Sequence, residues 1–162
     1  MSKAGPCTLY NGDCYEVSES IGHQLVNVMM LMRREVAARM SAHGLTDAQW
    51  KPLWMLKVGR ATTAFELARE MDVDAGAITR LVDRLAAKGL VERARSATDR
   101  RVVHLRLTSA GEIAVAEVPH VLASVNNDFL RGFSEPEWTQ MRKLLDRMTA
   151  NGVALQTQRA AA

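Results

Sequence analysis

Apolar residues recur three and four positions apart over residues 18–40, the spacing that places side chains on one face of an α-helix. The stripe consists of Ile21, Leu25, Val28, Met29, Met32, Val36 and Met40. Val26, Met30 and Leu31 lie outside this stripe, so the helix is apolar over more than one face. We therefore predict a long first helix that is buried between two neighbours, and a second subunit is a candidate for one of them.

A capping signal predicts the next helix. Thr46 and Gln49 have the spacing of a capping box, and Gly59 supplies a stop. Its buried side is formed by Trp50, Leu53, Trp54 and Leu56. Pro52 lies in the second turn and is expected either to shift the start of this helix or to bend it.

Two short helices follow. Apolar positions predict one helix over residues 64–71. Asp74 is a good N-cap for a second helix that runs to about Lys88, where Gly89 supplies the stop. The apolar face of this second helix contains Ile78, Leu81, Val82 and Leu85.

Basic residues concentrate around a predicted hairpin. Residues 90–93 and 102–107 suggest strands that flank the polar segment 96–101. Between Arg80 and Arg106 the chain has eight basic and three acidic residues, whereas its formal net charge is +3, so the remainder is net acidic. Such a segment is typical of a face that binds a polyanion, because neutralised phosphates release counterions. A solvated basic loop would have the same composition.

The C-terminal part is predicted to be helical. Thr108 or Ser109 caps a helix that runs to about Phe133, with Pro119 expected to bend it. Ser134 opens a last helix with a second capping box. The apolar stripe of that helix contains Trp138, Met141, Leu144, Leu145 and Met148.

Composition narrows the class of protein. The 162 residues are 48% apolar and 24% charged, as in ordinary globular chains. The longest apolar run, Val28–Met32, is far shorter than the roughly 20 residues that span a bilayer. A signal-peptide pattern is absent, and two cysteines cannot form a disulfide framework, so we expect a cytoplasmic protein. Residues 1–17 are expected to form an arm, and residues 156–162 to fray.

Two short helices and a basic-tipped hairpin make a winged helix-turn-helix. Its recognition helix must dock through an apolar inner face and offer small and hydrogen-bonding side chains to base edges. On the outer face of the helix after Asp74, Ala75 and Gly76 permit close approach to DNA. Thr79 can contact bases or a thymine methyl group, and Arg80 can address guanine. Arg84 is better placed for phosphate.

Three segments resemble the wing signature of the multiple antibiotic resistance regulator (MarR) family. They are Leu85-x-x-Lys88-Gly89-Leu90-Val91-Glu92-Arg93, Asp99-Arg100-Arg101 and Leu107-Thr108-x-x-Gly111. The segment Ala75–Leu85 is similar to the recognition helix of that family. The resemblance covers roughly residues 20–155, and the Asp-Arg-Arg element is its most specific part.

The resemblance implies a mainly α fold, a winged helix-turn-helix with long N- and C-terminal dimerisation helices. It implies a homodimer that binds a pseudo-palindromic double-stranded operator, usually as a repressor released by a small ligand or by cysteine oxidation. Arg101 matches the wing arginine that enters the minor groove, and Asp99 matches the acid that braces it. Arg100 is then a second groove contact or a phosphate contact. The expected DNA-binding residues are Ala75, Gly76, Thr79, Arg80, Arg84, Arg95, Asp99, Arg100 and Arg101.

The resemblance also implies an effector pocket where the first, second and fifth helices meet the winged domain, commonly for phenols or aryl carboxylates. The candidate residues are Ser20, His23, Trp50, Trp54 and Asn126. His23 could donate to a carboxylate or phenol oxygen, or be a partly exposed histidine without a partner. Trp54 could line the pocket or belong to the core.

Alternative functions have less support in the sequence. A thiol sensor would use Cys14, or Cys7, but the acidic neighbours Asp13 and Glu16 disfavour a reactive thiolate. The four histidines are scattered, so we expect no metal site and no cofactor. Motifs of hydrolases and nucleotide-binding enzymes are absent, so we expect no enzyme. A winged-helix protein-interaction module would not need the arginine-rich tip.

Together these features predict a domain organisation and a function. Residues 1–17 form the arm, residues 18–61 and 108–157 the dimerisation and scaffold helices, and residues 62–107 the DNA-binding domain. We expect a cytoplasmic repressor that is not membrane-bound and leaves its operator on binding a small aromatic acid or phenol.

Overall fold

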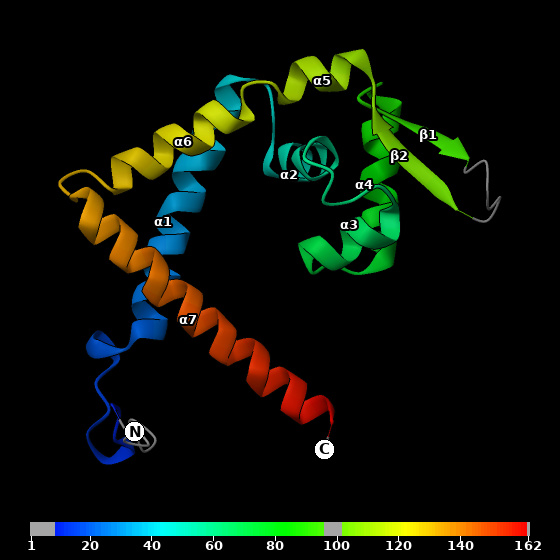
Figure 1. Cartoon of the computed structure of the whole chain (residues 1–162). Coiled ribbons are helices and arrows are strands. Elements are labelled where there is room, and N and C mark those ends of the chain that lie inside the picture. Colours follow the sequence, from blue (N-terminus) through cyan, green and yellow to red (C-terminus); the bar gives the residue numbers. More distant parts are fainter. Residues whose placement is uncertain (1–8, 96–101, 162) are drawn as a thin grey trace. The chain divides into compact units, whose positions relative to one another are not determined.

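The computed structural model of the chain describes residues 9–95 and 102–161 and is mainly helical, with one two-stranded antiparallel sheet (Figure 1). The elements are η1 (Gly12–Cys14), η2 (Val17–Glu19), α1 (Ile21–Ala42), α2 (Asp47–Lys57), α3 (Ala64–Met71), α4 (Ala75–Ala87), β1 (Val91–Arg95), β2 (Val103–Leu107), α5 (Ser109–Val115), α6 (Val118–Phe129) and α7 (Glu135–Ala160). The expected fold class, a mainly α winged helix, is confirmed. Among these described helices, none is both long and apolar enough to cross a membrane.

The chain divides into two compact units. The first unit ends at Val125, and the second begins at Asn126, within α6. The fully buried side chains of the first unit come from α1 through α6 and include Met40, Leu53, Leu67, Ile78, Val82, Leu85, Val115 and Val118. This core supports the helix-turn-helix and the strands.

Helix α1 begins at Ile21, slightly later than the predicted start at residue 18. Ser20 is its N-cap, and the Ser20 Oγ accepts a hydrogen bond of 3.3 Å from the His23 N–H. The hydroxyl of Tyr10 donates to the Glu19 carbonyl at 3.1 Å and accepts from the Ile21 N–H at 2.9 Å. Part of the predicted arm is therefore bonded to the start of α1.

Helix α2 begins at the predicted capping box. The Thr46 N–H donates to the Gln49 Oε1 at 3.0 Å, and the helix starts directly afterwards at Asp47. Pro52 is buried inside α2 and does not shift its start.

Helices α3 and α4 and the hairpin form the winged helix-turn-helix. In α4 the buried residues are Ile78, Leu81, Val82 and Leu85, as the sequence predicted. The strands pair in the register Val91↔Leu107 to Arg95↔Val103, and Thr63 adds an isolated antiparallel bridge to His104.

The predicted single helix from Thr108 to about Phe133 is wrong, because the chain forms two helices there. Helix α5 ends at Val115, and α6 begins at Val118. Pro119 explains the break: it has no N–H to donate, and its ring would clash with the carbonyl of Val115, four residues earlier. The interruption therefore comes before the proline, which lies in the first turn of α6, where proline is tolerated.

Helix α7 begins as predicted and ends later than predicted. The Ser134 N–H donates to the Glu137 Oε2 at 2.8 Å, which completes the capping box. The expected fraying from residue 156 is wrong, because α7 continues to Ala160. Its last turns contain ordinary helix formers and no glycine or proline after Gly152. Within α7 as described, no residue is buried.

Candidate nucleic-acid interface

Helix α4 separates an apolar inner face from an exposed outer face. Asp74 caps the helix, and its Oδ1 accepts from the Ala77 N–H at 2.9 Å. The exposed residues of the outer face are Ala75, Gly76, Thr79, Arg80, Asp83 and Arg84. Five residues predicted to contact DNA therefore lie together on one exposed helix face.

At the start of this face, the side chains of Thr79 and Arg80 each extend back toward a residue one helical turn earlier. The Thr79 Oγ1 donates to the Ala75 carbonyl at 2.8 Å. Arg80 extends back toward Gly76, since its Nη1 lies 3.9 Å from the position that a Cβ on residue 76 would take. The guanidinium thus lies near the N-terminal turn of α4. The positive end of the helix dipole at this turn also attracts anions such as phosphate.

The wing is joined to α4 by an ion pair that the sequence did not suggest. The Arg93 Nη2 on β1 lies 2.5 Å from the Asp83 Oδ1 on α4. Arg95 is exposed at the end of β1. The predicted tip residues Asp99, Arg100 and Arg101 lie outside the described residues.

The base of the wing explains why the sequence has Thr108 and Gly111 at these positions. The Thr108 N–H donates to the Leu90 carbonyl at 3.1 Å, and the Thr108 Oγ1 accepts from the Gly111 N–H at 3.1 Å. A Cβ added at residue 111 would lie 2.0 Å from the Leu90 carbonyl oxygen. Only glycine permits this approach of α5 to the segment before β1.

The five predicted effector residues come from α1 and its N-cap, from α2 and from α6. Ser20 is the N-cap of α1, and Asn126 is exposed on α6 at the start of the second unit. The His23 Nε2 lies 3.0 Å from the Asn27 Nδ2. Trp50 is buried, and its Nε1–H donates to the Asp47 Oδ1 at 2.9 Å. Trp54 is half-buried on α2.

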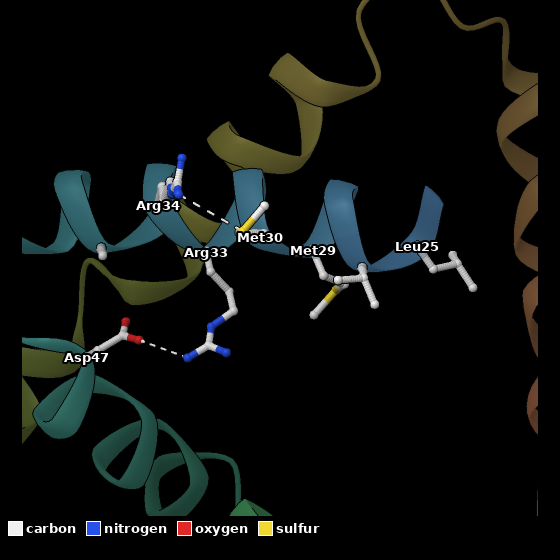
Figure 2. A pocket seen from close by; sticks show the side chains of 8 residues that line it. Leu25, Met29, Met30, Arg33, Arg34 and Asp47 are labelled. Carbon is white, nitrogen blue, oxygen red and sulfur yellow. Dashed lines mark hydrogen bonds and ion pairs between the residues drawn. The ribbon is translucent and has the colours of Figure 1, made fainter. Parts of the chain in front are cut away.

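An open groove of about 630 Å³ lies beside α1 (Figure 2). Its lining residues are Leu25, Val26, Met29, Met30, Arg33, Arg34, Ala37 and Asp47. Figure 2 shows Arg33 directed toward Asp47, with 3.9 Å between the Arg33 Nη2 and the Asp47 Oδ2. The sequence offered one signal for this groove, because Met29 and Arg33 are four residues apart on the first helix.

The carboxyl of Asp47 is held in its charged form. Burial raises the pKa of Asp47, but the hydrogen bonds from Trp50 and Lys51 and the charges of Lys51 and Arg33 outweigh that effect. The net result is a pKa below the ordinary aspartate value. The groove therefore contains an apolar wall, two guanidinium groups and one carboxylate.

One of the two cysteines, Cys14, lies within the described residues. Cys14 is free and exposed on η1, and Cys7 lies outside the described residues. Across residues 9–95 and 102–161, no group of three or more His, Cys, Asp or Glu side chains could hold a metal ion.

Comparisons with known proteins agree with this geometry. A MarR family model matches residues 43–102. The crystal structure of the transcriptional regulator PA3341 is 35% identical over 82% of this chain and 97% of that chain, with a TM-score of 0.69. A mutant MarR from E. coli complexed with operator DNA is 27% identical over 79% of this chain and 92% of that chain, with a TM-score of 0.69. The S. aureus MepR–DNA complex, 18% identical over 83% of this chain and 97% of that chain, shares the fold at a TM-score of 0.71. The chain thus belongs to the MarR family of transcriptional regulators.

Proposed function

We propose that this chain is a homodimeric repressor that binds a pseudo-palindromic operator and leaves it on binding a small aromatic acid or phenol. The observation that carries the proposal is the outer face of α4, on which small residues and two exposed arginines lie beside a wing strand. Such a face suits the major groove, since small residues permit close approach and guanidinium groups bond guanine or phosphate. The complex of the related MarR with operator DNA supports DNA as the partner, and a MepR–DNA complex shares the fold.

Exposed apolar side chains support the dimer. On α1, Ile21 is 42% exposed, Val28 47% and Leu31 50%, and none of the three lines the groove. On α7 the large exposed apolar residues are Trp138, Leu144, Leu145, Met148, Val153 and Leu155. Large apolar side chains that stay exposed along a helix, as on α1 and separately on α7, are typical of a subunit interface. A two-fold dimer would set two α4 helices about 34–36 Å apart, one helical turn of DNA.

The groove beside α1 is the effector site that the geometry favours. Methionine side chains make favourable contacts with aromatic rings, and a guanidinium forms paired hydrogen bonds with a carboxylate. The Arg33–Asp47 pair is long, and its side chains are 65% and 38% exposed, so it is weak and open to competition.

A ligand in this groove has a route to the DNA-binding segment. Asp47 is the first residue of α2, and α2 contacts α3, α4 and β2. An aryl carboxylate that bonds Arg33 in place of Asp47 would break the ion pair between α1 and α2. To empty the operator the ligand must prefer the released arrangement by several kcal/mol.

Binding in solution tests the proposal. Duplexes recovered from a randomised pool should compete about a thousandfold or more better than bulk DNA, the usual range for specific binding. Benzoate or phenol should then lower the affinity for the recovered duplex. Equal affinity for recovered and bulk DNA would contradict operator binding. If peroxide releases the chain from DNA and no aromatic compound does, a cysteine rather than an aromatic ligand controls DNA binding.

A further inference from the structure

The groove beside α1 has a wall that an oxidant can modify. Of the methionines that the structure describes, Met29, Met30 and Met148 are exposed, and the first two line the groove. Met29 is 56% exposed and Met30 44%, whereas Met40, further along the same helix, is fully buried. An exposed thioether is oxidised to a sulfoxide more readily than a buried one. Two groove residues are therefore open to a modification from which the core methionine is protected.

Each of these two methionines lies one helical turn before an arginine. Met29 precedes Arg33 by four residues, and the two share one side of α1. Met30 precedes Arg34 in the same way, and long helical side chains point back toward the N-terminus. The Arg34 Nη2 accordingly lies 4.0 Å from the Met30 Sδ, whereas Arg33 is directed toward Asp47 (Figure 2). The sulfur of Met30 therefore has a guanidinium beside it.

Oxidation would change both the wall and this contact. Hydrogen peroxide transfers one oxygen atom to the thioether sulfur, accepts two electrons from it and leaves as water. The product is a sulfoxide, which is polar where the thioether was apolar. On Met30 an oxygen added on the side of Arg34 would accept a charge-assisted hydrogen bond, because the sulfur already lies 4.0 Å from the Nη2. The guanidinium would then be bonded to the groove wall and less available to a ligand carboxylate.

We propose that Met29 and Met30 form an oxidation site, and that their sulfoxides lower the affinity of the groove for an aromatic acid. Each oxidation removes a sulfur–aromatic contact, and the one on Met30 also engages Arg34. The oxidised chain then stays on its operator at an effector concentration that releases the unoxidised chain. Methionine sulfoxide reductases reverse the modification. The inference rests on the proposed function, since it adds regulation to the effector site proposed there.

Controlled oxidation tests this inference. The starting protein carries Cys7→Ser and Cys14→Ser, so that no thiol reacts, and is treated with hydrogen peroxide. Peptide mass spectrometry should show that Met29 and Met30 gain oxygen before Met40 does. Titration calorimetry should then show benzoate binding weakened by about 3- to 150-fold, the range for the loss of two sulfur–aromatic contacts. Treatment with sulfoxide reductases for both sulfoxide epimers should restore the affinity.

Two variants of this cysteine-free protein assign the effect to the groove. The double variant Met29→Leu, Met30→Leu keeps an apolar wall that cannot be oxidised, so its benzoate affinity should be equal before and after peroxide. Met148→Leu removes a methionine that is 45% exposed on α7, and this variant should lose affinity on oxidation as the cysteine-free protein does. Far-UV circular dichroism checks that the helices stay folded after oxidation.

Other results would overturn the inference. If Met29 and Met30 react no earlier than Met40, the groove wall is not open to the oxidant. If both residues carry oxygen and benzoate binds as before, the sulfoxides do not control the groove. The same follows if the double leucine variant loses as much affinity on oxidation as the cysteine-free protein. In these cases the proposed function stands, whereas an unoxidised chain that binds no benzoate would contradict the effector site and this inference together.

Discussion

Arg93 on β1 and Asp83 on α4 form an ion pair of 2.5 Å that joins the wing to the recognition helix. Both side chains are roughly half-exposed, so the pair adds little to global stability. Its position matters more, because it fixes one wing strand against the helix whose outer face carries Arg80 and Arg84. The pair is therefore placed to hold two elements of the proposed DNA-binding face in one relative orientation.

The Asp83→Asn variant tests whether Asp83 positions the wing or only contributes a negative charge to the DNA-binding face. Removing a negative charge from the proposed DNA-binding face should strengthen binding to all DNA. Loss of the ion pair should at the same time lower the ratio of specific to bulk affinity by about two- to fivefold, the range of an exposed ion pair. Competition binding at two salt concentrations measures both quantities. A uniform rise in affinity with an unchanged ratio would show that the pair does not position the wing.

Gly111→Ala should destabilise the chain. The added Cβ would lie 2.0 Å from the Leu90 carbonyl oxygen, so α5 or the segment before β1 must move. Overpacking of this kind costs about 1–3 kcal/mol of the free energy of unfolding. Gly12→Ala is the matched control, since nothing lies within 4 Å of its added Cβ. Equal urea midpoints for the two variants would contradict the close approach.

Glu66 should make stability depend on pH in the acid range. The hydrogen bond from the Thr62 backbone N–H is the largest of several that lower the pKa of Glu66. Because the folded pKa lies below the unfolded one, this stabilisation is present above the ordinary glutamate pKa of about 4.3 and is lost as the pH falls below it.

The measurement for Glu66 is the free energy of unfolding of the wild type and of Glu66→Gln at pH 7 and pH 3.5. The difference between the two proteins should be larger at pH 7. Glu92→Gln, an exposed residue on β1, serves as the control. A difference that stays constant between the two pH values would exclude this role of the carboxylate.

Arg33→Gln should weaken the binding of an aryl carboxylate without weakening DNA binding. Loss of a charge-assisted hydrogen bond to a carboxylate corresponds to about 1.5–3 kcal/mol, or roughly 10- to 150-fold in the dissociation constant. Titration calorimetry with benzoate measures this effect. Arg131→Gln, which removes an exposed arginine paired with Asp128, is the control. If both variants bind benzoate like the wild type, the groove beside α1 is not the effector site.

Local signals predicted the helices and strands of the winged helix-turn-helix closely. The predicted caps at Asp74 and Thr108 act on N–H groups three residues away, and the apolar face of α4 follows the helical period. Such features depend on neighbouring residues alone. The same holds for Pro119, whose effect was expected but was assigned to a bend within one helix rather than to a break at Val115.

Contacts between distant segments could not be predicted. The Arg93–Asp83 pair exists only once the hairpin folds back on α4, and Gly111 meets Leu90 only once α5 packs against the wing. Trp50 stays a predicted effector residue, and in the structure its indole N–H donates to Asp47 within α2. The groove needed the placement of Asp47 opposite Arg33, which no local pattern encodes.

The central claim is that two copies of this chain present their α4 helices to successive major grooves of one operator. A hydroxyl-radical footprint of the chain on its recovered duplex, with the number of bound chains determined by sedimentation, tests the claim most directly. The account predicts two chains per duplex and two protected half-sites whose centres are about 10–10.5 base pairs apart. A single chain that protects one half-site, with the same affinity for an isolated half-site, would contradict it.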